Sequence, residues 1–525
     1  MKKKTQILSA IIAIAICSLL LFAAYESMSL SQSVGDINDQ TGDSESSNST
    51  TTSKTDQNGS NGASDTNLST GDSDTSSTES STEDSYDQTG SGEDHEDAAD
   101  YVWDSSEVID IELNGNSITV NATGVATIDG STVTITSAGT YRISGSLTDG
   151  QIIVDTDDKE TMRLILNGID VSCSTSSPIY ILDAKKVIIV LEENTENYVK
   201  DGVSYVFKDT TEDEPNAAIF SKSDLTIFGD GLLNVDGNYN DGIASKDGLI
   251  IKSGTIIINS VDDGIRGKDY LIIKSGEITV NSGGDGMKSD NANDGTVGYI
   301  SIENGVITIT SGGDAIQAIT DITITGGKIT VTSGGGSNTP TYSDISAKGI
   351  KANVSVTVDG GTITANSADD AIHSNDKITI NGGSFIISTG DDGFHADSSL
   401  IINGGDITIS KSYEGLESAT ITINNGRIHI MSSDDGINVV GGNDASGFDR
   451  GPGMPPGQDP FAYSSDYYLH IYGGYIYVDA MGDGIDVNGV VEMTAGTLII
   501  NGPVANDNGA LDFGSFKITG GFLLE

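Results

Sequence analysis

The chain has 525 residues, including 66 glycines but only one tryptophan, and it carries a formal net charge of -51 at pH 7. So acidic a chain is repelled by nucleic acids and by anionic membranes, which excludes both kinds of binding function, and it attracts divalent cations. Glycine, Asp, Asn, Ser, Thr and Ile dominate, a composition that favours an all-β fold with many turns.

The N-terminus is typical of an exported protein. Three lysines precede an apolar run over residues 7–24, as in a secretion signal or an uncleaved membrane anchor. We predict that residues 1–26 form this leader and that the rest of the chain is extracellular or tethered to the cell surface. Beyond the leader only Cys173 remains, so the exported part can form no internal disulfide and no cysteine metal cluster.

The remaining chain divides by composition into three parts. Residues 27–100 consist mostly of Ser, Thr, Asp, Glu, Gly and Asn and have too little apolar surface to fold, so we predict a disordered acidic linker. Residues 101–216 contain apolar strands at irregular spacing, as expected of the N-terminal cap and first irregular rungs of a solenoid. Regular repeats occupy residues 217–525, with a Gly/Pro-rich insert at 441–465.

The regular repeats have a period of about 22 residues. In each repeat an alternating apolar strand leads through a Ser/Asn turn into Asp-Gly-Ile or a close variant, and its acidic residue recurs at positions 241, 263, 285, 370, 392, 414 and 435. A fixed period of this length marks a solenoid, because one repeat cannot bury its apolar face without neighbours.

One repeat shows the strand pattern. Alternate residues are apolar in three short segments: Thr362–Ala365, Ala371–His373 and Lys377–Ile380. Successive residues of a strand point to opposite faces, so the isoleucines must point inward. Three strands per repeat predict an all-β, right-handed parallel β-helix, with rungs ~4.8 Å apart.

The Asp-Gly-Ile segments place carboxylates above one another in such a stack. Like charges ~5 Å apart repel unless cations lie between them, and calcium accepts carboxylate oxygens in flexible geometry. Aspartates are also common in turns for purely structural reasons, which is the alternative interpretation. The predicted calcium ligands are Asp241, Asp262, Asp263, Asp285, Asp369, Asp370, Asp391, Asp392, Asp434, Asp435, Asp483 and Asp486.

The residue after the isoleucine of each repeat is expected to point outward. In two successive repeats it is His373 and His395, which should stack one rung apart. Beside aspartate pairs, stacked imidazoles can bind a transition metal, transfer protons or contact a ligand. The alternative is an exposed stack that binds nothing.

A second candidate surface lies on another strand. Tyr475 and Tyr477 alternate with apolar residues and should point outward, near His429 of an earlier rung. Exposed aromatic faces suit stacking on sugars, which have an apolar face and a polar rim. Together with His373 and His395, these are the predicted carbohydrate-binding residues. The alternative is that the Gly/Pro-rich insert covers the tyrosines.

Two segments and the Asp-Asp-Gly repeats carry a resemblance to a known family. The segments are Ala218-Ile-Phe-Ser-Lys-Ser-Asp-Leu-Thr-Ile and Tyr239-Asn-Asp-Gly-Ile-Ala-Ser-Lys-Asp. Over residues 105–525 the chain resembles the clostridial carbohydrate-binding β-helix family. The resemblance implies calcium and the binding of cellulose and polygalacturonate. That family is similar in architecture to the family 9 pectate lyases, which hold calcium with an Asp-Asp-Gly-x-Asp motif and use a lysine base.

Compared with the lyase motif, this chain keeps the first carboxylates and loses most of the last ones. The position of the last aspartate is occupied by Arg266, His373, His395 and Asn438, and only Asp486 keeps the carboxylate. The motif is therefore incomplete.

A lyase base would be Lys288 or Lys268, but acidic surroundings raise the pKa of a lysine and oppose this role. The sequence favours a monomeric, non-catalytic protein that binds acidic polysaccharide or cellulose with the help of calcium. Two alternatives remain: a calcium-dependent polysaccharide lyase, and a structural adhesin or spacer.

Overall fold

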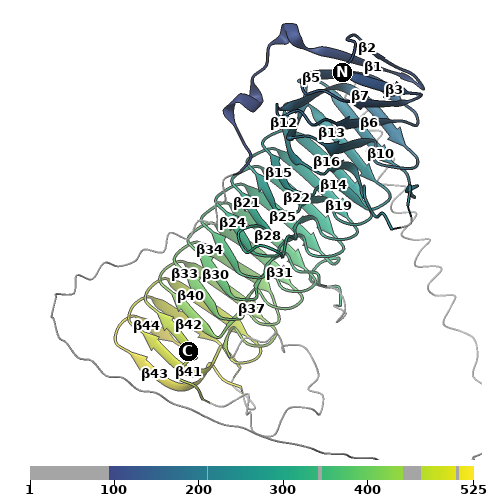
Figure 1. Cartoon of the computed structure of the whole chain (residues 1–525). Helices are drawn as coiled ribbons and strands as arrows, with labels where there is room; N and C mark the ends of the chain where they lie inside the picture. Colours follow the sequence, from purple (N-terminus) through teal and green to yellow (C-terminus); the bar gives the residue numbers. More distant parts are fainter. Residues whose placement is uncertain (1–93, 210, 341–345, 441–462, 504–507) are drawn as a thin grey trace, which may run out of the picture. The chain divides into compact units, whose positions relative to one another are not determined.

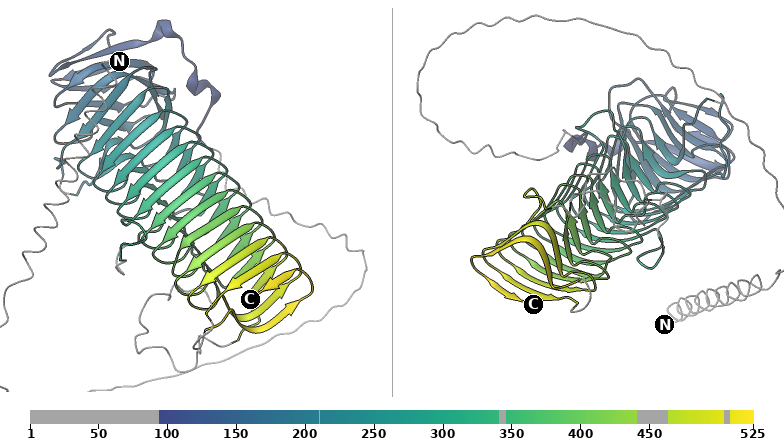
Figure 2. Two further views of the ribbon diagram at one scale, coloured as in Figure 1. Left: turned by 180° about the vertical axis from the view of Figure 1, so that it is seen from behind. Right: turned by 90° about the horizontal axis from the view of Figure 1, so that it is seen from below.

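The computed structural model describes residues 94–209, 211–340, 346–440, 463–503 and 508–525. From β11 onward nearly every strand pairs in parallel with the strand three places later in the sequence. Each turn of the chain therefore adds one strand to each of three sheets, as the stacked arrows in Figure 1 and Figure 2 show. The parallel β-helix predicted from the sequence is confirmed.

Three sheets, numbered in the order in which the chain passes through them, make up the regular part. Sheet 1 carries the Asp-Gly-Ile segments and consists of β11 (Ala217–Ser221), β14 (Asp241–Ser245), β17 (Ile265–Gly267), β20 (Met287–Ser289), β23 (Ile316–Ala318), β26 (Ile350–Ala352), β29 (Ile372–Ser374), β32 (Phe394–Ala396), β35 (Leu416–Ser418) and β38 (Ile437–Val439). Sheet 2 consists of β12 (Asp224–Gly229), β15 (Gly248–Ile251), β18 (Tyr270–Ile273), β21 (Tyr299–Ile302), β24 (Asp321–Ile324), β27 (Ser355–Val358), β30 (Lys377–Ile380), β33 (Ser399–Ile402), β36 (Thr420–Ile423) and β39 (Tyr468–Ile471).

Sheet 3 completes each rung and consists of β13 (Leu232–Gly237), β16 (Thr255–Ser260), β19 (Glu277–Ser282), β22 (Val306–Ser311), β25 (Lys328–Ser333), β28 (Thr362–Ser367), β31 (Ser384–Thr389), β34 (Asp406–Lys411), β37 (Arg427–Ser432), β40 (Tyr475–Ala480), β42 (Thr497–Asn501) and β44 (Phe522–Leu524). Near the C-terminus, β41 (Ile485–Met493) pairs with both β38 and β39 and therefore passes from sheet 1 into sheet 2. The next strand, β43 (Leu511–Ile518), pairs with β41 along both parts.

The first strands are less regular. They are β1 (Ile109–Gly115), β2 (Ile118–Val120), β3 (Ala126–Asp129), β4 (Thr132–Ile135), β5 (Thr140–Leu147), β6 (Gln151–Asp155), β7 (Met162–Cys173), β8 (Ile179–Asp183), β9 (Lys186–Leu191) and β10 (Glu196–Asp201). The pairs β1–β2 and β3–β4 are antiparallel, whereas β5 to β10 already pair in parallel with strands of neighbouring rungs. Two 3-10 turns, η1 (Ala98–Tyr101) and η2 (Ser105–Glu107), precede them.

Apolar columns that pass from rung to rung form the core. On sheet 1 the parallel register aligns Ile243 with Ile265 and then Met287, and further along it aligns Phe394 with Leu416. All five side chains are fully buried. Burial of each contributes about 1.5–3 kcal/mol, so the stacking of rungs holds the fold together.

Glycine is required at two positions of the repeat, for two different physical reasons. A Cβ on Gly264, in Asp-Asp-Gly-Ile, would lie 2.3 Å from Cγ1 of Val280 and 2.6 Å from the carbonyl oxygen of Gly286 in the next rung. Gly276, in the turn before β19, has φ of +122°, which other residues rarely adopt. The first glycine permits close packing of rungs, and the second permits the turn.

The folded part begins earlier than the predicted linker boundary at residue 100. Residues 94–107 run along the outside of sheet 2, visible as the dark segment beside the first rungs in Figure 1. Asp94 and Glu96 pair with Lys274, and Asp100 lies 2.6 Å from Lys186. These acidic residues look like linker by composition, but each has a lysine partner on the β-helix, and this ordered segment was missed for that reason.

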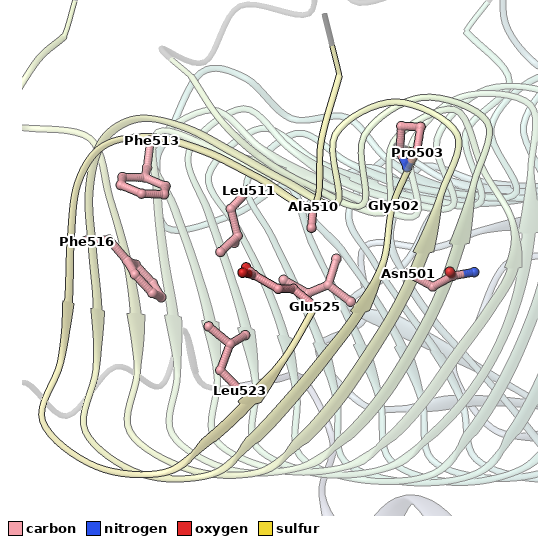
Figure 3. A pocket seen from close by; sticks show the side chains of 10 residues that line it. Asn501, Gly502, Pro503, Ala510, Leu511, Phe513, Phe516, Leu523 and Glu525 are labelled. Atoms are coloured by element: carbon pink, nitrogen blue, oxygen red, sulfur yellow. The ribbon is translucent and has the colours of Figure 1, made fainter. Parts of the chain in front are cut away.

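The core is open at its C-terminal end. Leu511, Phe516 and Leu523 continue the inner columns of the preceding rung. Figure 3 shows their side chains, with Phe513, around a hollow of about 690 Å³ inside the last turn. This hollow is an extension of the apolar core.

Three predicted segments lie wholly or mainly outside the described residues. They are the leader at 1–26, the linker as far as residue 93, and the insert at 441–465, of which only residues 463–465 are described. Within the described part of the chain, no helix is long and apolar enough to cross a membrane.

Candidate functional site

A column of carboxylates follows the Asp-Gly-Ile segments along sheet 1. We call it the acidic ladder; its members are Asp241, Asp263, Asp285, Asp314, Asp370, Asp392, Glu414, Asp435 and Asp483. In most rungs one carboxylate oxygen accepts a hydrogen bond from the backbone N–H of the ladder residue in the next rung. Asp263 Oδ1 accepts from Asp285 N–H at 2.9 Å, and Asp370 Oδ1 accepts from Asp392 N–H at 3.0 Å. One oxygen is thus structural, and the other is left to meet a cation.

In the first rungs the second oxygen meets a lysine of the chain itself. Lys288 Nζ lies 3.1 Å from Asp263 Oδ2 and 2.8 Å from Asp285 Oδ2. Burial lowers the pKa of Lys288, but the two carboxylates outweigh burial and raise it above its usual range. A lysine held protonated cannot act as a base, so the geometry opposes a catalytic role for Lys288. The other candidate base, Lys268, lies in the turn between β17 and β18.

A second lysine is buried further along the ladder. Lys348 Nζ lies 2.8 Å from Asp369 Oδ1 and 2.7 Å from Asp370 Oδ2, and its side chain is only 7% exposed. Asp369, Asp370 and Asp391 bring their oxygens within 4.8 Å of one another. The ammonium group therefore already supplies a positive charge to this predicted calcium site.

The beginning of the ladder is neutralised by an arginine. Asp241, Asp262 and Asp263 also bring their oxygens within 4.8 Å of one another, and Arg266 Nε lies 3.7 Å from Asp241 Oδ2. Burial raises the pKa of Asp241 to about 7; Arg266 lowers it, and the two neighbouring carboxylates raise it. The guanidinium group stands where the lyase motif has its last carboxylate.

The C-terminal part of the ladder is different. Among the residues that the structure describes, no lysine or arginine forms an ion pair with Asp434, Asp435, Asp483 or Asp486. Burial, with the neighbouring carboxylates, raises the pKa of Asp435 to about 7 and that of Asp486 to about 6. Within the described residues, these four predicted ligands therefore have no lysine or arginine to neutralise them.

His373 and His395 stack as predicted, with ring centroids 4.9 Å apart. They are not exposed, however, because neighbouring side chains cover them and leave them 6% and 0% exposed. Nδ1 of each ring lies beside the aspartate three residues earlier, at 2.8 Å from Asp370 Oδ2 and 3.1 Å from Asp392 Oδ2. These contacts hold the rings against the sheet, so the two histidines cannot contact a polysaccharide as expected.

An aromatic concavity of about 410 Å³ lies on the outer face of sheet 3, between β37 and β40. His429 and Tyr477 are register partners, and their rings meet edge to face with centroids 4.9 Å apart. The Tyr475 ring is 40% exposed and lies 5.7 Å from the guanidinium carbon of Arg427. The predicted outward placement of both tyrosines and of His429 is confirmed. The residues that line the concavity are Arg427, Ile428, His429, Met431, Tyr475, Tyr477 and Asp479.

The sequence analysis missed Arg427 and His470. Arg427 occupies in β37 the position that Tyr475 occupies in β40, so comparison of equivalent repeat positions would have found it. A second aromatic row lies on β39 and the turn after it, where the His470 ring lies 4.3 Å from Tyr468 and 5.7 Å from Tyr472. Its signal was the alternation of Tyr468 and His470 with buried residues.

The structure is a solenoid with a ladder of carboxylates on one sheet and an aromatic concavity on another. The chain belongs to the family described as carbohydrate-binding domain-containing proteins, whose family model matches residues 129–393 and 392–436. Membership in this family supports carbohydrate as the ligand.

Two known proteins are similar to the chain. A carbohydrate-binding domain-containing protein of Acetivibrio thermocellus is 39% identical over 120 residues, which are 23% of this chain and 42% of that relative. This chain therefore matches less than half of the relative's length. A solved structure, a gadolinium derivative of the polysaccharide lyase-like protein from C. thermocellum, is 31% identical with a TM-score of 0.44, covering 48% of this chain and 96% of that one.

Proposed function

We propose that the protein is an exported, non-catalytic carbohydrate-binding protein that holds acidic cell-wall polysaccharide, such as polygalacturonate, with the help of calcium. Cellulose is the second candidate ligand. The observation that carries the proposal is the concavity on sheet 3, in which two tyrosines, a histidine and an arginine from adjacent rungs meet at the surface.

The concavity has the groups that sugar binding requires. Tyr475 and Tyr477 offer partly exposed rings, which can stack on the apolar face of a pyranose while their hydroxyls reach its polar rim. Arg427 adds a planar guanidinium that can pair with a sugar carboxylate through two parallel hydrogen bonds. Asp479 adds an acceptor for sugar hydroxyls.

Charge explains why calcium belongs to the proposal. A protein of net charge -51 repels an acidic polysaccharide over about 10 Å at ordinary ionic strength, and one arginine does not offset this. Divalent cations held between protein carboxylates and sugar carboxylates convert the repulsion into attraction. A cation site close to the aromatic concavity is therefore expected.

We place the proposed calcium site in the C-terminal part of the ladder, because there the described residues provide no lysine or arginine that pairs with the carboxylates. Asp435 and Asp483 follow β37 and β40, the two strands that line the concavity, and Asp434 and Asp486 interact electrostatically with them. Calcium is bound by six to eight oxygens, including carboxylates and backbone carbonyls, in flexible geometry. In the earlier rungs, the ladder carboxylates pair with Arg266, Lys288 or Lys348 instead of being left for a metal ion.

Export rests on the leader. A basic N-terminus followed by the apolar run at residues 7–24 directs secretion or anchors a chain in the membrane. The acidic stretch from residue 27 to residue 93 is long enough to hold the β-helix away from a cell surface.

The test is retention of the purified protein on polygalacturonate and on cellulose, in calcium and in chelator, with the supernatant assayed for unsaturated, ultraviolet-absorbing product. We expect retention on polygalacturonate that chelator abolishes, without product. The double substitution Tyr475→Ala, Tyr477→Ala should abolish retention. Thr330→Ala, at the equivalent outward position of β25, is the matched control.

Other outcomes would assign the protein differently. Product release would make it a calcium-dependent lyase, with Lys288 and Lys268 as the candidate catalytic bases. If the protein is not retained and releases no product, with calcium or with chelator, it is an adhesin or spacer. The ladder then only stabilises the β-helix.

A further inference from the structure

Two carboxylates converge on one imidazole nitrogen inside sheet 1. Nδ1 of His395 lies 3.1 Å from Asp392 Oδ2 and 2.9 Å from Glu417 Oε2. Register places Glu417 of β35 directly beside His395 of β32, and Asp392 lies three residues before His395. The side chains of all three are at most 2% exposed. The convergence is therefore buried and built by two adjacent rungs.

Hydrogen bonding within the protein does not satisfy this cluster. Nδ1 carries at most one proton, and its hydrogen bond is to Asp392. Glu417 Oε2, although buried and close to the same nitrogen, has no hydrogen-bond partner. In the next rung, the buried Asn438 beside Glu417 also has an oxygen without a hydrogen bond. A buried carboxylate oxygen that accepts no hydrogen bond is costly, and a metal ion among these atoms would relieve the cost.

The outer contacts are those of a metal-binding histidine. Nε2 of His395 lies 3.2 Å from Asp397 Oδ1, so the proton on Nε2 can be donated to Asp397 while Nδ1 presents its lone pair to the cluster. Asp392 is fixed in turn, because its Oδ1 accepts the backbone N–H of Glu414 at 3.1 Å. Carboxylates that orient the far nitrogen of a ligating histidine, and hydrogen bonds that fix ligating carboxylates, are the usual outer shell of metal sites.

The ligand atoms select the class of metal. One imidazole nitrogen and two carboxylate oxygens suit zinc and related transition metals. With metal–ligand distances of about 2.0–2.2 Å, tetrahedral ligands lie roughly 3.3 Å apart, so the two distances from Nδ1 to the carboxylate oxygens would lengthen by only a few tenths of an ångström. Calcium needs six to eight oxygens, which this buried cluster does not offer.

The neighbouring rung does not repeat the site. His373 has an equivalent contact with Asp370, but Lys348 Nζ lies 2.7 Å from the same Asp370 oxygen and neutralises it. The cluster at His395 has no lysine in that position, since the ladder residue one rung before Asp392 is Asp370 itself.

We propose that Asp392, His395 and Glu417 bind one zinc-class divalent transition metal, with Asp397 as the positioning residue and with the fourth coordination place open to water. The site is separate from the proposed calcium site at Asp435 and Asp483, although it uses Asp392, which the sequence analysis assigned to calcium. It does not depend on sugar binding.

The experiment uses the full-length protein, stripped of metal by chelator, dialysed, and then titrated with Zn²⁺ by calorimetry and with Co²⁺ by visible absorption. Excess calcium is present throughout to occupy the exposed carboxylates. We expect one equivalent of tight Zn²⁺ binding and a tetrahedral Co²⁺ spectrum that Zn²⁺ abolishes. Zinc should also raise the thermal midpoint.

The variants assign the ligands. Glu417→Gln and His395→Asn should weaken Zn²⁺ binding by more than about 100-fold, and Asp397→Asn by about 10–100-fold. His470→Asn removes an imidazole from the outer face of sheet 2 and should leave binding unchanged. Circular dichroism of each variant checks the fold. If His395→Asn does not fold, two other results decide whether the cluster binds metal. They are Zn²⁺ binding by Glu417→Gln, which is close to isosteric, and the Co²⁺ spectrum of the unsubstituted protein.

Three results would overturn the proposal: no stoichiometric Zn²⁺ binding, binding unchanged in both Glu417→Gln and Asp397→Asn, or displacement of the metal by calcium. Failure of polysaccharide retention would leave these results unaffected, so the two proposals can fail independently.

Discussion

The two ends of the acidic ladder have the same backbone geometry and opposite electrostatics. From Asp241 to Asp370 the second carboxylate oxygen meets Arg266, Lys288, Lys351 or Lys348. From Asp435 onward the described residues provide no such cation, and burial together with the neighbouring carboxylates raises the pKa values of Asp435 and Asp486. The same repeat therefore serves as a self-neutralised scaffold at one end and as a candidate cation site at the other.

The difference shows how a solenoid acquires a site without changing its fold. One basic residue decides whether a ladder carboxylate is neutralised: Arg266 and Lys288 lie three places after a ladder aspartate, and Lys348 occupies the ladder position of its own rung. The aromatic concavity lies at the end that lacks internal cations, where a bound metal ion could also contact an acidic sugar.

The largest effect is expected at Lys348. Lys348→Met leaves Asp369 and Asp370 as buried charges without their partner, and breaking a buried ion pair costs about 3–5 kcal/mol. The midpoint of chemical denaturation should fall accordingly in chelator and should recover partly in calcium, because oxygens of Asp369, Asp370 and Asp391 lie within 4.8 Å of one another and an ion there would replace the lost positive charge.

The matched control is Lys222→Met. Lys222 lies 3.6 Å from Glu214 and is 38% exposed, so its removal should cost less than about 1 kcal/mol. If Lys348→Met were as stable as the unsubstituted protein, the idea that internal lysines neutralise the ladder would be wrong.

The next effect concerns the aromatic concavity. Tyr477→Ala alone should weaken binding to soluble oligogalacturonate about ten-fold, which corresponds to about 1.4 kcal/mol of lost stacking. Titration calorimetry in calcium measures the change. Thr330→Ala, on the same column nearer the N-terminal end, should bind normally; equal losses in both variants would contradict a local site.

A smaller effect follows from the raised pKa of Asp435. The folded pKa of about 7 lies above the ordinary 3.8, so the folded state binds more protons between these values. Asp435 therefore contributes stability that is present below pH 4 and is lost as the pH rises towards 7. In chelator, Asp435→Asn should show a flatter decline of the thermal midpoint over this range than the unsubstituted protein.

Calcium provides the second half of that measurement. Above pH 7 it should stabilise the unsubstituted protein more than Asp435→Asn, because a bound ion removes the carboxylate repulsion. Identical calcium responses in the two proteins would place the ion elsewhere.

The smallest effect is expected at Asp262. Its side chain is exposed and lies at the end of the ladder that Arg266 neutralises, so Asp262→Asn should change the free energy of unfolding by less than about 0.5 kcal/mol. Polysaccharide retention should be unchanged. A clear loss of calcium-dependent retention would show that cations bind at the N-terminal end after all.

The sequence by itself determined the β-helix, its repeat and its inward columns, because a two-residue alternation and a fixed period are local patterns that parallel stacking must satisfy. It also placed Tyr475, Tyr477 and His429 on one outer face, because every second residue of a strand points outward. The acidic residues of the ladder were visible for the same reason.

Only the tertiary structure decided which of these carboxylates are free to bind a cation. The pairing of Lys348 with Asp370, the burial of His373 and His395, and the fixing of Asp94 to Lys274 join residues that lie from three to 180 positions apart. Such contacts depend on side-chain rotamers and on local burial, which period and composition do not encode. The fold is therefore a property of the repeat, whereas the candidate sites arise where individual residues depart from it.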